Sequence, residues 1–201
     1  MHSLQGKNII GCAHTGSGKT ACFALPVLQK LAKDPYGIFA LVITPTRELA
    51  YQINEQFKTF SGQNLNLRTS VITGGVNMML QASELNDIPH VIVGTPGRLV
   101  HQLKHDQFSF KEYLSNLQFL VLDEADRMLT DPTIQEDLTY ILNAIKEVQE
   151  TRRQTFLYSA TMARNFESLF SKELVFGKFL NDDKSDNFDI VEVGNNETAD
   201  S

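Results

Sequence analysis

The chain of 201 residues has only two cysteines, no tryptophan and no long apolar run. Cys12 and Cys22 are too few for the disulfide framework of a small secreted protein, and an intracellular, reduced environment fits the sequence. No apolar run is long enough to span a membrane, and the N-terminus lacks the apolar centre of a signal peptide. His101 and His105 stand at i and i+4 on an expected helix without a third ligand, which favours a solvated helix face over a metal site. These absences argue against disulfide-rich, membrane-spanning and zinc-dependent proteins.

Positive charge is in short supply as well. The formal net charge is −6, which argues against a strongly basic nucleic-acid binder. The acidic excess comes from residues 181–201, where seven acidic side chains stand against Lys184, so residues 1–180 are neutral as a whole. A neutral body can still hold a nucleic acid with modest affinity through backbone amides and a few arginines. Because residues 181–201 are rich in Asp, Asn and Ser, we expect a flexible tail or linker there.

Short apolar runs alternate with stretches of helical periodicity along the chain. The strand-like runs are 8–10, 39–43, 69–72, 90–93, 119–122, 154–158 and 174–179. The expected helices cover about 18–32, 48–60, 78–85, 98–104 and 133–148. In the last of these, the apolar residues at 134, 138, 141, 142 and 145 recur at helical spacing and are expected to face a core. The alternation predicts an α/β fold with a doubly wound, mostly parallel sheet, and residues 1–180 are enough for one domain.

A glycine-rich segment, AHTGSGKT, follows the first strand-like run and precedes a helical stretch. It fits the second half of the phosphate-loop pattern. Gly16 and Gly18 let backbone N–H groups approach phosphate oxygens, and the N-terminus of the following helix favours the same negative charge. Lys19 is expected to bind the outer phosphates, and Thr20 to offer its hydroxyl to Mg²⁺. A glycine-rich turn without a ligand is the alternative, but it does not require Lys-Thr after the glycine. The predicted nucleotide-binding residues are Ala13, His14, Thr15, Gly16, Ser17, Gly18, Lys19 and Thr20, with no chemistry assigned to the His14 side chain.

A pair of acidic residues, Asp123 and Glu124, directly follows the apolar run 119–122. Such a run is typical of a strand buried on both faces of a parallel sheet, and ligands gather at the carboxyl ends of such strands. Asp123 is therefore expected to hold Mg²⁺, in part through water, and Glu124 to orient and deprotonate an attacking water. Alone, the pair would indicate only the start of a helix. Together with the phosphate loop, it predicts hydrolysis of a nucleoside triphosphate, with Lys19, Asp123 and Glu124 as the catalytic residues.

Six short segments together resemble one family. In chain order they are AHTGSGKT at 13–20, PTRELA at 45–50, GG at 74–75, TPGR at 95–98, DEAD at 123–126 and SAT at 159–161. They are similar to the first RecA-like domain of DEAD-box RNA helicases, a P-loop NTPase domain in which Ala13 in place of the first glycine is expected. Residues 34–53 and 89–99 look closest to the subfamily implicated in small-subunit ribosomal RNA processing. The resemblance implies ATP and Mg²⁺ as cofactors, RNA as a partner, and a nuclear or nucleolar location.

The resemblance assigns three strand-end segments to RNA binding. Small residues, backbone amides and arginines at successive strand ends also suit contact with a sugar–phosphate backbone rather than reading of bases. An ordinary turn at Pro-Gly and a loop requiring positive φ at Gly-Gly are the physical alternatives. Thr46 can in addition cap the helix that follows it. The predicted RNA contacts are Pro45, Thr46, Arg47, Gly74, Gly75, Thr95, Pro96, Gly97 and Arg98.

The SAT segment is implied to couple ATP hydrolysis to separation of RNA strands. The hydroxyls of Ser159 and Thr161 are expected to bond to the DEAD segment at Asp126. A local turn stabilised by Ser and Thr explains the same residues nearly as well.

The resemblance also implies parts that this sequence does not contain. One is a glutamine-bearing segment upstream of the phosphate loop that recognises adenine, and the other is a second RecA-like domain whose arginines reach the γ-phosphate. Arginines of this kind are worth ~10³–10⁵ in rate. We therefore expect a monomeric chain that binds nucleotide weakly, hydrolyses it slowly and does not unwind RNA alone. Two other functions remain open: another class of P-loop ATPase, which would not explain PTRELA and TPGR, and a non-catalytic module that docks RNA or protein partners.

Overall fold

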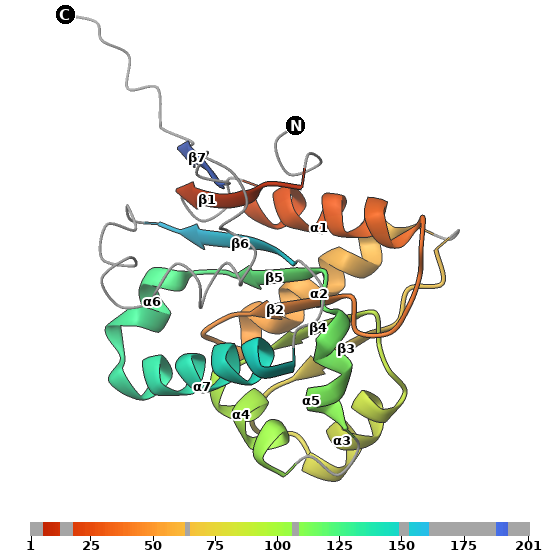
Figure 1. Cartoon of the computed structure of the whole chain (residues 1–201), viewed down its shortest axis with the longest axis vertical. Coiled ribbons are helices and arrows are strands. Elements are labelled where there is room, and N and C mark those ends of the chain that lie inside the picture. Colours follow the sequence, from red (N-terminus) through yellow and green to blue (C-terminus); the bar gives the residue numbers. More distant parts are fainter. Residues whose placement is uncertain are drawn as a thin grey trace, which may run out of the picture.

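The computed structural model describes residues 6–12, 18–62, 65–105, 109–148, 153–160 and, as backbone, 188–192. In these residues one sheet runs in the order β3-β4-β2-β5-β6-β1-β7, and every pair of neighbouring strands is parallel (Figure 1). Because all strands point the same way, the loops that follow them meet at one edge. The strands are β1 (Asn8–Cys12), β2 (Ala40–Ile43), β3 (Thr69–Ile72), β4 (Val91–Gly94), β5 (Phe119–Leu122), β6 (Gln154–Ser159) and β7 (Phe188–Glu192).

Helices connect the strands and cover both faces of the sheet (Figure 1). They are α1 (Lys19–Leu31), α2 (Arg47–Ser61), α3 (Met78–Asn86), α4 (Pro96–Lys104), α5 (Phe110–Tyr113), α6 (Ala125–Thr130) and α7 (Pro132–Val148), with a short 3-10 helix, η2 (Leu114–Asn116). None of the helices in the described residues is long and apolar enough to cross a membrane.

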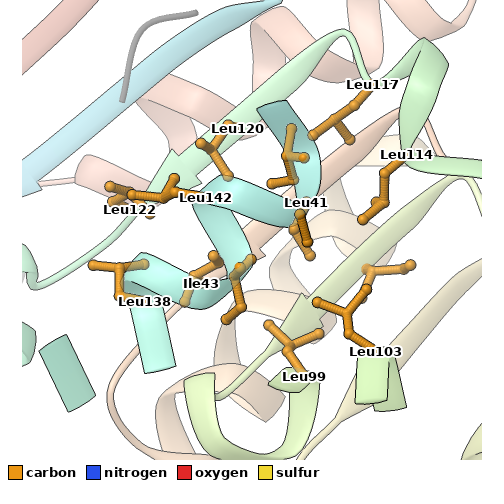
Figure 2. Close-up of a cluster of buried hydrophobic side chains, with 14 of the residues drawn as sticks. Leu41, Ile43, Leu99, Leu103, Leu114, Leu117, Leu120, Leu122, Leu138 and Leu142 are labelled. Carbon is orange, nitrogen blue, oxygen red and sulfur yellow. The ribbon is translucent and has the colours of Figure 1, made fainter. Parts of the chain in front are cut away.

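Alternate side chains of the central strands enter two separate cores. In β2, Leu41 and Ile43 pack on the face covered by α4, α6 and α7, whereas Ala40 and Val42 pack on the face covered by α1 and α2. Figure 2 shows the first core, in which Leu99 and Leu103 of α4 and Leu138 and Leu142 of α7 approach the strands. Strands buried on both faces read as continuous apolar runs, which is why the runs in the sequence locate them.

The predicted α/β architecture is confirmed, and six of the predicted strands lie within two residues of their expected bounds. The helix predicted at about 133–148 spans Pro132–Val148, and its predicted apolar positions are buried or packed against the first core. The predicted strand at 174–179 lies outside the described residues.

The last strand was not expected. The sequence predicts a flexible acidic tail over 181–201, whereas the structure has β7 within this segment, paired in parallel with β1. Its residues include β-branched Ile190 and Val191, which favour strands. The pairing also satisfies backbone groups along the outer edge of β1, which would otherwise face solvent. The acidic composition of residues 181–201 predicted a flexible tail, and the short stretch that forms β7 was therefore missed.

Several helical details also differ from the expectation, and helix α6, which begins at Ala125, was not among the predicted helices. Helix α4 begins at Pro96, two residues earlier than predicted, because proline fits the first helical position, where no N–H partner is needed. The segment TPGR is thus the start of a helix rather than a plain turn. The short helix α5 and the turn η2 were missed, since they are brief and are held by burial of Phe110 and Leu114 rather than by a long periodic pattern.

Backbone hydrogen bonds continue from strand to strand into the loops at the carboxyl edge. The Asp123 N–H donates to the carbonyl of Ile43 at 2.9 Å, and the Thr44 N–H donates to the carbonyl of Gly94 at 3.0 Å. The Thr95 N–H donates to the carbonyl of Ile72 at 3.0 Å. The first residue after each of these strands is therefore fixed to its neighbour, which makes this edge a rigid base for a site.

Core packing on α2 gives a direct stability prediction. Phe57 is fully buried between α2 and the sheet, whereas Phe60, one turn later, is 39% exposed. Phe57→Ala is expected to lower the free energy of unfolding by about 3 to 5 kcal/mol, because the lost transfer energy adds to the cost of a cavity. Phe60→Ala serves as the matched control and is expected to cost less than about 1 kcal/mol. Urea unfolding of both variants measures the difference, and equal costs would contradict this account of the core.

Candidate functional site

Two buried charges face the carboxyl edge of the sheet from either side of β6. Lys19 is the first residue of α1, after Gly18, whose φ of 85° is one that glycine adopts readily. Its side chain is 9% exposed, and its Nζ has no hydrogen-bond partner in the described residues. Asp123 follows β5 and is 3% exposed. The rest of the predicted phosphate loop, residues 13–17, lies outside the described residues.

The electrostatics of Asp123 show that the two charges act on one another. Burial raises the pKa of the Asp123 carboxyl to about 6, because an ionised carboxylate is costly away from water, and the charge of Lys19 acts in the opposite direction. The Asp123 Oδ1 accepts one hydrogen bond, from the Glu124 N–H at 3.1 Å. A buried cation without a hydrogen-bond partner among the described residues and a buried, incompletely compensated carboxylate form a site suited to an anionic ligand and a cation together.

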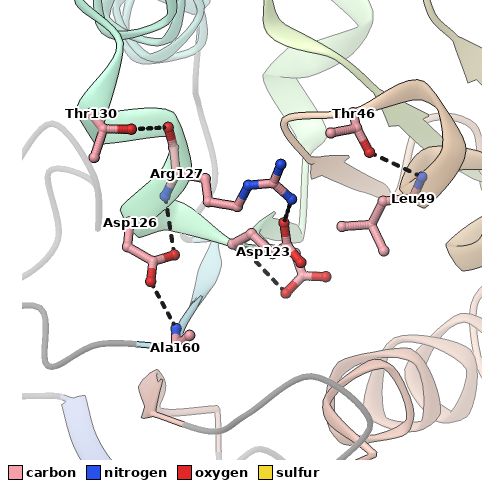
Figure 3. A network of polar contacts seen from close by, with 8 residues as sticks. Thr46, Leu49, Asp123, Asp126, Arg127, Thr130 and Ala160 are labelled. Carbon is pink, nitrogen blue, oxygen red and sulfur yellow. Dashed lines mark hydrogen bonds and ion pairs between the residues drawn. The ribbon is translucent and has the colours of Figure 1, made fainter.

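Glu124 has a left-handed backbone and a side chain paired with an arginine. Its φ of 51° and ψ of 47° are left-handed, which is uncommon for a residue with a side chain. The carboxylate, 15% exposed, forms an ion pair at 2.6 Å with the Arg127 guanidinium, which is 61% exposed. Figure 3 shows Arg127 beside the Asp123 segment at the start of α6. Arg127 has no counterpart in the sequence prediction, although its spacing of three residues from Glu124 could have indicated the pair.

Asp126 is linked to the end of β6 through a backbone group. Its Oδ2 accepts a hydrogen bond from the backbone N–H of Ala160 at 3.1 Å (Figure 3). Cys12, at the end of β1, in turn contacts the Ala160 carbonyl through its Sγ at 3.7 Å. The bond expected from the Ser159 hydroxyl stays a prediction, and Thr161 lies outside the described residues. The peptide of Ala160 thus bridges β1 and α6, a role that no side-chain pattern could reveal.

The three predicted RNA segments lie together on the other half of the edge. Thr46 caps α2 as predicted: its hydroxyl accepts from the Leu49 N–H at 3.3 Å (Figure 3). Arg47 donates through Nη1 to the Gly74 carbonyl at 3.2 Å, and Arg98 donates through Nη2 to the Val76 carbonyl at 2.6 Å. The loop of residues 73–76, between β3 and α3, is therefore contacted by the segments that follow both β2 and β4.

Glycine is required at one position of this loop. Gly75 has a φ of 82°, and a Cβ on it would lie 2.3 Å from Nη1 of Arg47. Gly74 has open space where a Cβ would be. The positive φ expected for the Gly-Gly loop is therefore present at Gly75, while the surface at Gly74 stays accessible to a ligand.

The N-terminus of α4 lies close to a neighbouring helix. Thr95 makes no side-chain capping bond there. A Cβ added to Gly97 would lie 3.2 Å from Oδ2 of Asp137, a residue of α7, so glycine at this position lets the two helices approach. Burial raises the pKa of the Asp137 carboxyl, and the charge of Lys104 acts in the opposite direction. No pattern in the sequence indicates this contact.

The histidine pair on α4 has no metal-binding partners among the described residues. The rings of His101 and His105 stack with centroids 4.4 Å apart. No cluster of three or more His, Cys, Asp or Glu side chains suited to a metal occurs in the part of the chain that the structure describes.

Comparison with known proteins agrees with this arrangement. The model of the DEAD/DEAH box helicase family matches residues 1–169. The chain belongs to the DEAD/DEAH box helicase family. It is 52% identical over 167 residues to the probable ATP-dependent RNA helicase DDX49 of Homo sapiens, covering 83% of this chain and 33% of that protein. It is 50% identical over 175 residues to the ATP-dependent rRNA helicase RRP3 of Yarrowia lipolytica, covering 87% of this chain and 34% of that protein.

A solved structure places the fold in the same family. The DEAD-box helicase Mss116, bound to single-stranded RNA and UDP-BeF, matches with a TM-score of 0.79 and 27% identity, covering 94% of this chain and 38% of that one. The DEAD-box chain spans about a third of the length of the curated relatives that it matches. The predicted family and RecA-like fold are thereby confirmed.

The raised pKa of Asp123 predicts that this residue destabilises the fold when ionised. Because its pKa is about 6 in the folded chain and 3.8 for an ordinary aspartate, the folded state binds the proton more tightly. Stability is therefore lost as pH rises from about 3.8 through about 6. Asp123→Asn is expected to raise the free energy of unfolding by a few kcal/mol at pH 8 and by about half as much at pH 5.

Urea unfolding of the ligand-free chain at the two pH values measures this gain. Asp87→Asn, at an exposed position just after α3, is the control and is expected to change stability by less than about 0.5 kcal/mol. A loss of stability in Asp123→Asn at pH 8 would contradict the burial of an ionised carboxylate.

Proposed function

We propose that this chain is the first RecA-like domain of an ATP-dependent RNA helicase, in which ATP hydrolysis is coupled to local separation of an RNA duplex. Residues 1–180 would form the domain and 181–201 an acidic tail or linker, with a second RecA-like domain as the main partner. The observation that carries the proposal is the buried Lys19 ammonium, without a hydrogen-bond partner in the described residues, acting on Asp123 from across β6.

The residues on both sides of β6 fit ATP and Mg²⁺. Lys19 and Asp123 influence one another electrostatically but form no direct ion pair among the described residues. This is the arrangement expected when phosphate oxygens and a metal ion lie between such groups. Lys19 would bind the outer phosphates, and Thr20 and Asp123 would hold Mg²⁺, with Asp123 acting partly through water. When bound, Mg²⁺ would neutralise charge on the phosphates.

The chain's own residues supply the remaining chemistry. Glu124 is the general base: one carboxylate oxygen is held by Arg127, and the other can accept a proton from water. The left-handed backbone at Glu124 directs its side chain differently from that of Asp123, so that two adjacent carboxylates can serve two roles. Asp126 would transmit the state of the site through the Ala160 peptide to the SAT segment, which includes Ser159 and Thr161.

The RNA surface would lie at the ends of β2, β3 and β4. Its residues would be Pro45, Thr46, Arg47, Gly74, Gly75, Thr95, Pro96, Gly97 and Arg98. The N-termini of α2 and α4 and the Gly-Gly loop lie at the same edge, and all offer backbone N–H groups to a phosphate. The relatives named ATP-dependent RNA helicases, and Mss116 with bound single-stranded RNA, support RNA as the ligand.

A role in ribosome biogenesis and a nucleolar location complete the proposal. Their support is the likeness to RRP3 proteins, which are named rRNA helicases. A non-catalytic docking module is less well supported, because Lys19, Asp123 and Glu124 are all present and follow strands at the same edge of the sheet. A P-loop ATPase of another class would not explain why Arg47 and Arg98 both contact one loop.

A steady-state ATPase assay tests the function. The chain alone is expected to hydrolyse ATP slowly, with little response to RNA. Adding the second RecA-like domain of a full-length relative in trans, together with single-stranded RNA, is expected to raise turnover by about 10³-fold or more, because that domain supplies arginines to the γ-phosphate. Single-stranded DNA replaces RNA in the control. Stimulation by DNA as strong as by RNA would favour a helicase of another class.

Substitution of the proposed base gives a sharper test. Glu124→Gln is expected to lower ATP turnover by about 10²-fold or more while nucleotide affinity stays within a few-fold, because an amide cannot accept the proton. Glu136→Gln, at a surface position of α7, is the matched control and should retain full turnover. Unchanged turnover in Glu124→Gln would show that another group is the base.

A further inference from the structure

The two arginines that converge on the 73–76 loop differ in how they are held. Arg98, half-buried in the first turn of α4, donates through Nε to the Thr73 carbonyl at 3.1 Å and through Nη2 to the Val76 carbonyl at 2.6 Å. Arg47 is exposed and donates only through Nη1 to the Gly74 carbonyl at 3.2 Å. Two carbonyls at opposite ends of the loop thus share the planar guanidinium of Arg98, a geometry that lysine cannot reproduce.

A buried amide supports the loop from the same side. Gln81, a buried residue of α3, donates through Nε2 to the Thr73 carbonyl at 3.0 Å and to the Val71 carbonyl at 3.3 Å. The Thr73 carbonyl therefore accepts from both Gln81 and Arg98, which uses its two lone pairs. Side chains of α2, α3 and α4 thus donate to the carbonyls of Thr73, Gly74 and Val76 and hold the loop.

The direction of each fixed carbonyl in the loop also sets the direction of the N–H group that follows it in the chain. In a trans peptide the C=O and the following N–H point in opposite directions. The carbonyls of residues 73, 74 and 76 are turned toward arginines, so the N–H groups of Gly74, Gly75 and Asn77 are turned away from them. None of these N–H groups has an acceptor among the residues that the structure describes. Neighbouring N–H groups without an acceptor in the described residues can together bind an anion.

We infer that Arg98 is a positioning residue that shapes the 73–76 loop into a phosphate-binding site of backbone N–H groups, whereas Arg47 contacts the RNA backbone directly. The inference rests on the proposed RNA-binding function and divides its arginines into two roles. Arg98 already uses two of its donor groups inside the protein, and a phosphate could engage it only if the loop lost its shape. Arg47 uses a single donor and keeps the others at the surface.

Salt dependence of RNA binding separates these roles. Each phosphate contact on a single strand contributes a slope of about −0.7 to log K against log of salt concentration. Arg47→Met is expected to reduce the slope by about 0.7, and Arg47→Lys to retain it. Arg98→Met and Arg98→Lys are both expected to lower affinity about tenfold with the slope unchanged, because the charge is not what the loop needs. Binding of a fluorescent oligo-U RNA with Mg·ATP analogue present measures all five proteins.

A second measurement does not depend on RNA. Backbone ¹⁵N order parameters of Gly74 and Gly75 are expected near about 0.85 in the unsubstituted chain and below about 0.6 in both Arg98 variants. The Arg47 variants should keep the higher values, and unchanged affinity for a fluorescent ADP would show that all variants fold.

The possible results separate the role of Arg98 from RNA binding by the chain. Full RNA affinity in Arg98→Lys, together with a reduced slope in Arg98→Met, would identify Arg98 as a phosphate contact and overturn the inference. A chain that binds no single-stranded RNA would contradict the proposed RNA surface, and the order parameters would then decide the role of Arg98 alone. Rigid glycines in both Arg98 variants would overturn it.

Discussion

The site depends on two buried, opposite charges that form no direct ion pair with one another among the described residues. A lysine and an aspartate that are buried among apolar groups usually pair directly or lose their charges, because burial of either ion is costly. Here Lys19 begins a helix after β1 and Asp123 follows β5, with β6 lying between the two strands. Parallel pairing of these strands fixes the backbone positions from which the two side chains extend. A bound triphosphate and metal would compensate both buried charges.

Strand order divides the functional edge into two halves. The three strands β5, β6 and β1 carry the proposed nucleotide site, and the three strands β2, β4 and β3 carry the proposed RNA surface. The halves meet where β2 pairs with β5, and there the Asp123 N–H donates to the Ile43 carbonyl. From that bond a series of backbone hydrogen bonds continues to the end of β3, next to the loop that both arginines hold. The two ligands would thus rest on one continuous framework.

The sequence allowed the framework to be predicted but not its finest contacts. Apolar runs located six of the strands because a doubly covered strand must be apolar at every position, and the short motifs after those runs then had to meet at one edge. Contacts made by backbone atoms carry no such signature. The Ala160 N–H on Asp126, and the carbonyls of Thr73 and Val76 on Arg98, depend on how peptide planes are turned. The strand β7 was missed for a different reason, because its acidic neighbours dominated the composition of that segment.

A rigid framework limits where coupling between nucleotide and RNA can occur. Backbone bonds between buried strands cannot change without disrupting the core, so the groups able to change partner are the exposed ones at the edge. Arg127 on Glu124 and Arg47 on Gly74 are such groups, since solvent-exposed ion pairs and hydrogen bonds are weak and exchange at little cost. Arg98, half-buried and bonded twice, is not. A phosphate arriving at either half of the edge can therefore displace an exposed guanidinium while the loops keep their shape. If the domain binds both proposed ligands, its surfaces for them are already formed, and the motion required by the proposed strand separation would come from movement of whole domains rather than from this sheet.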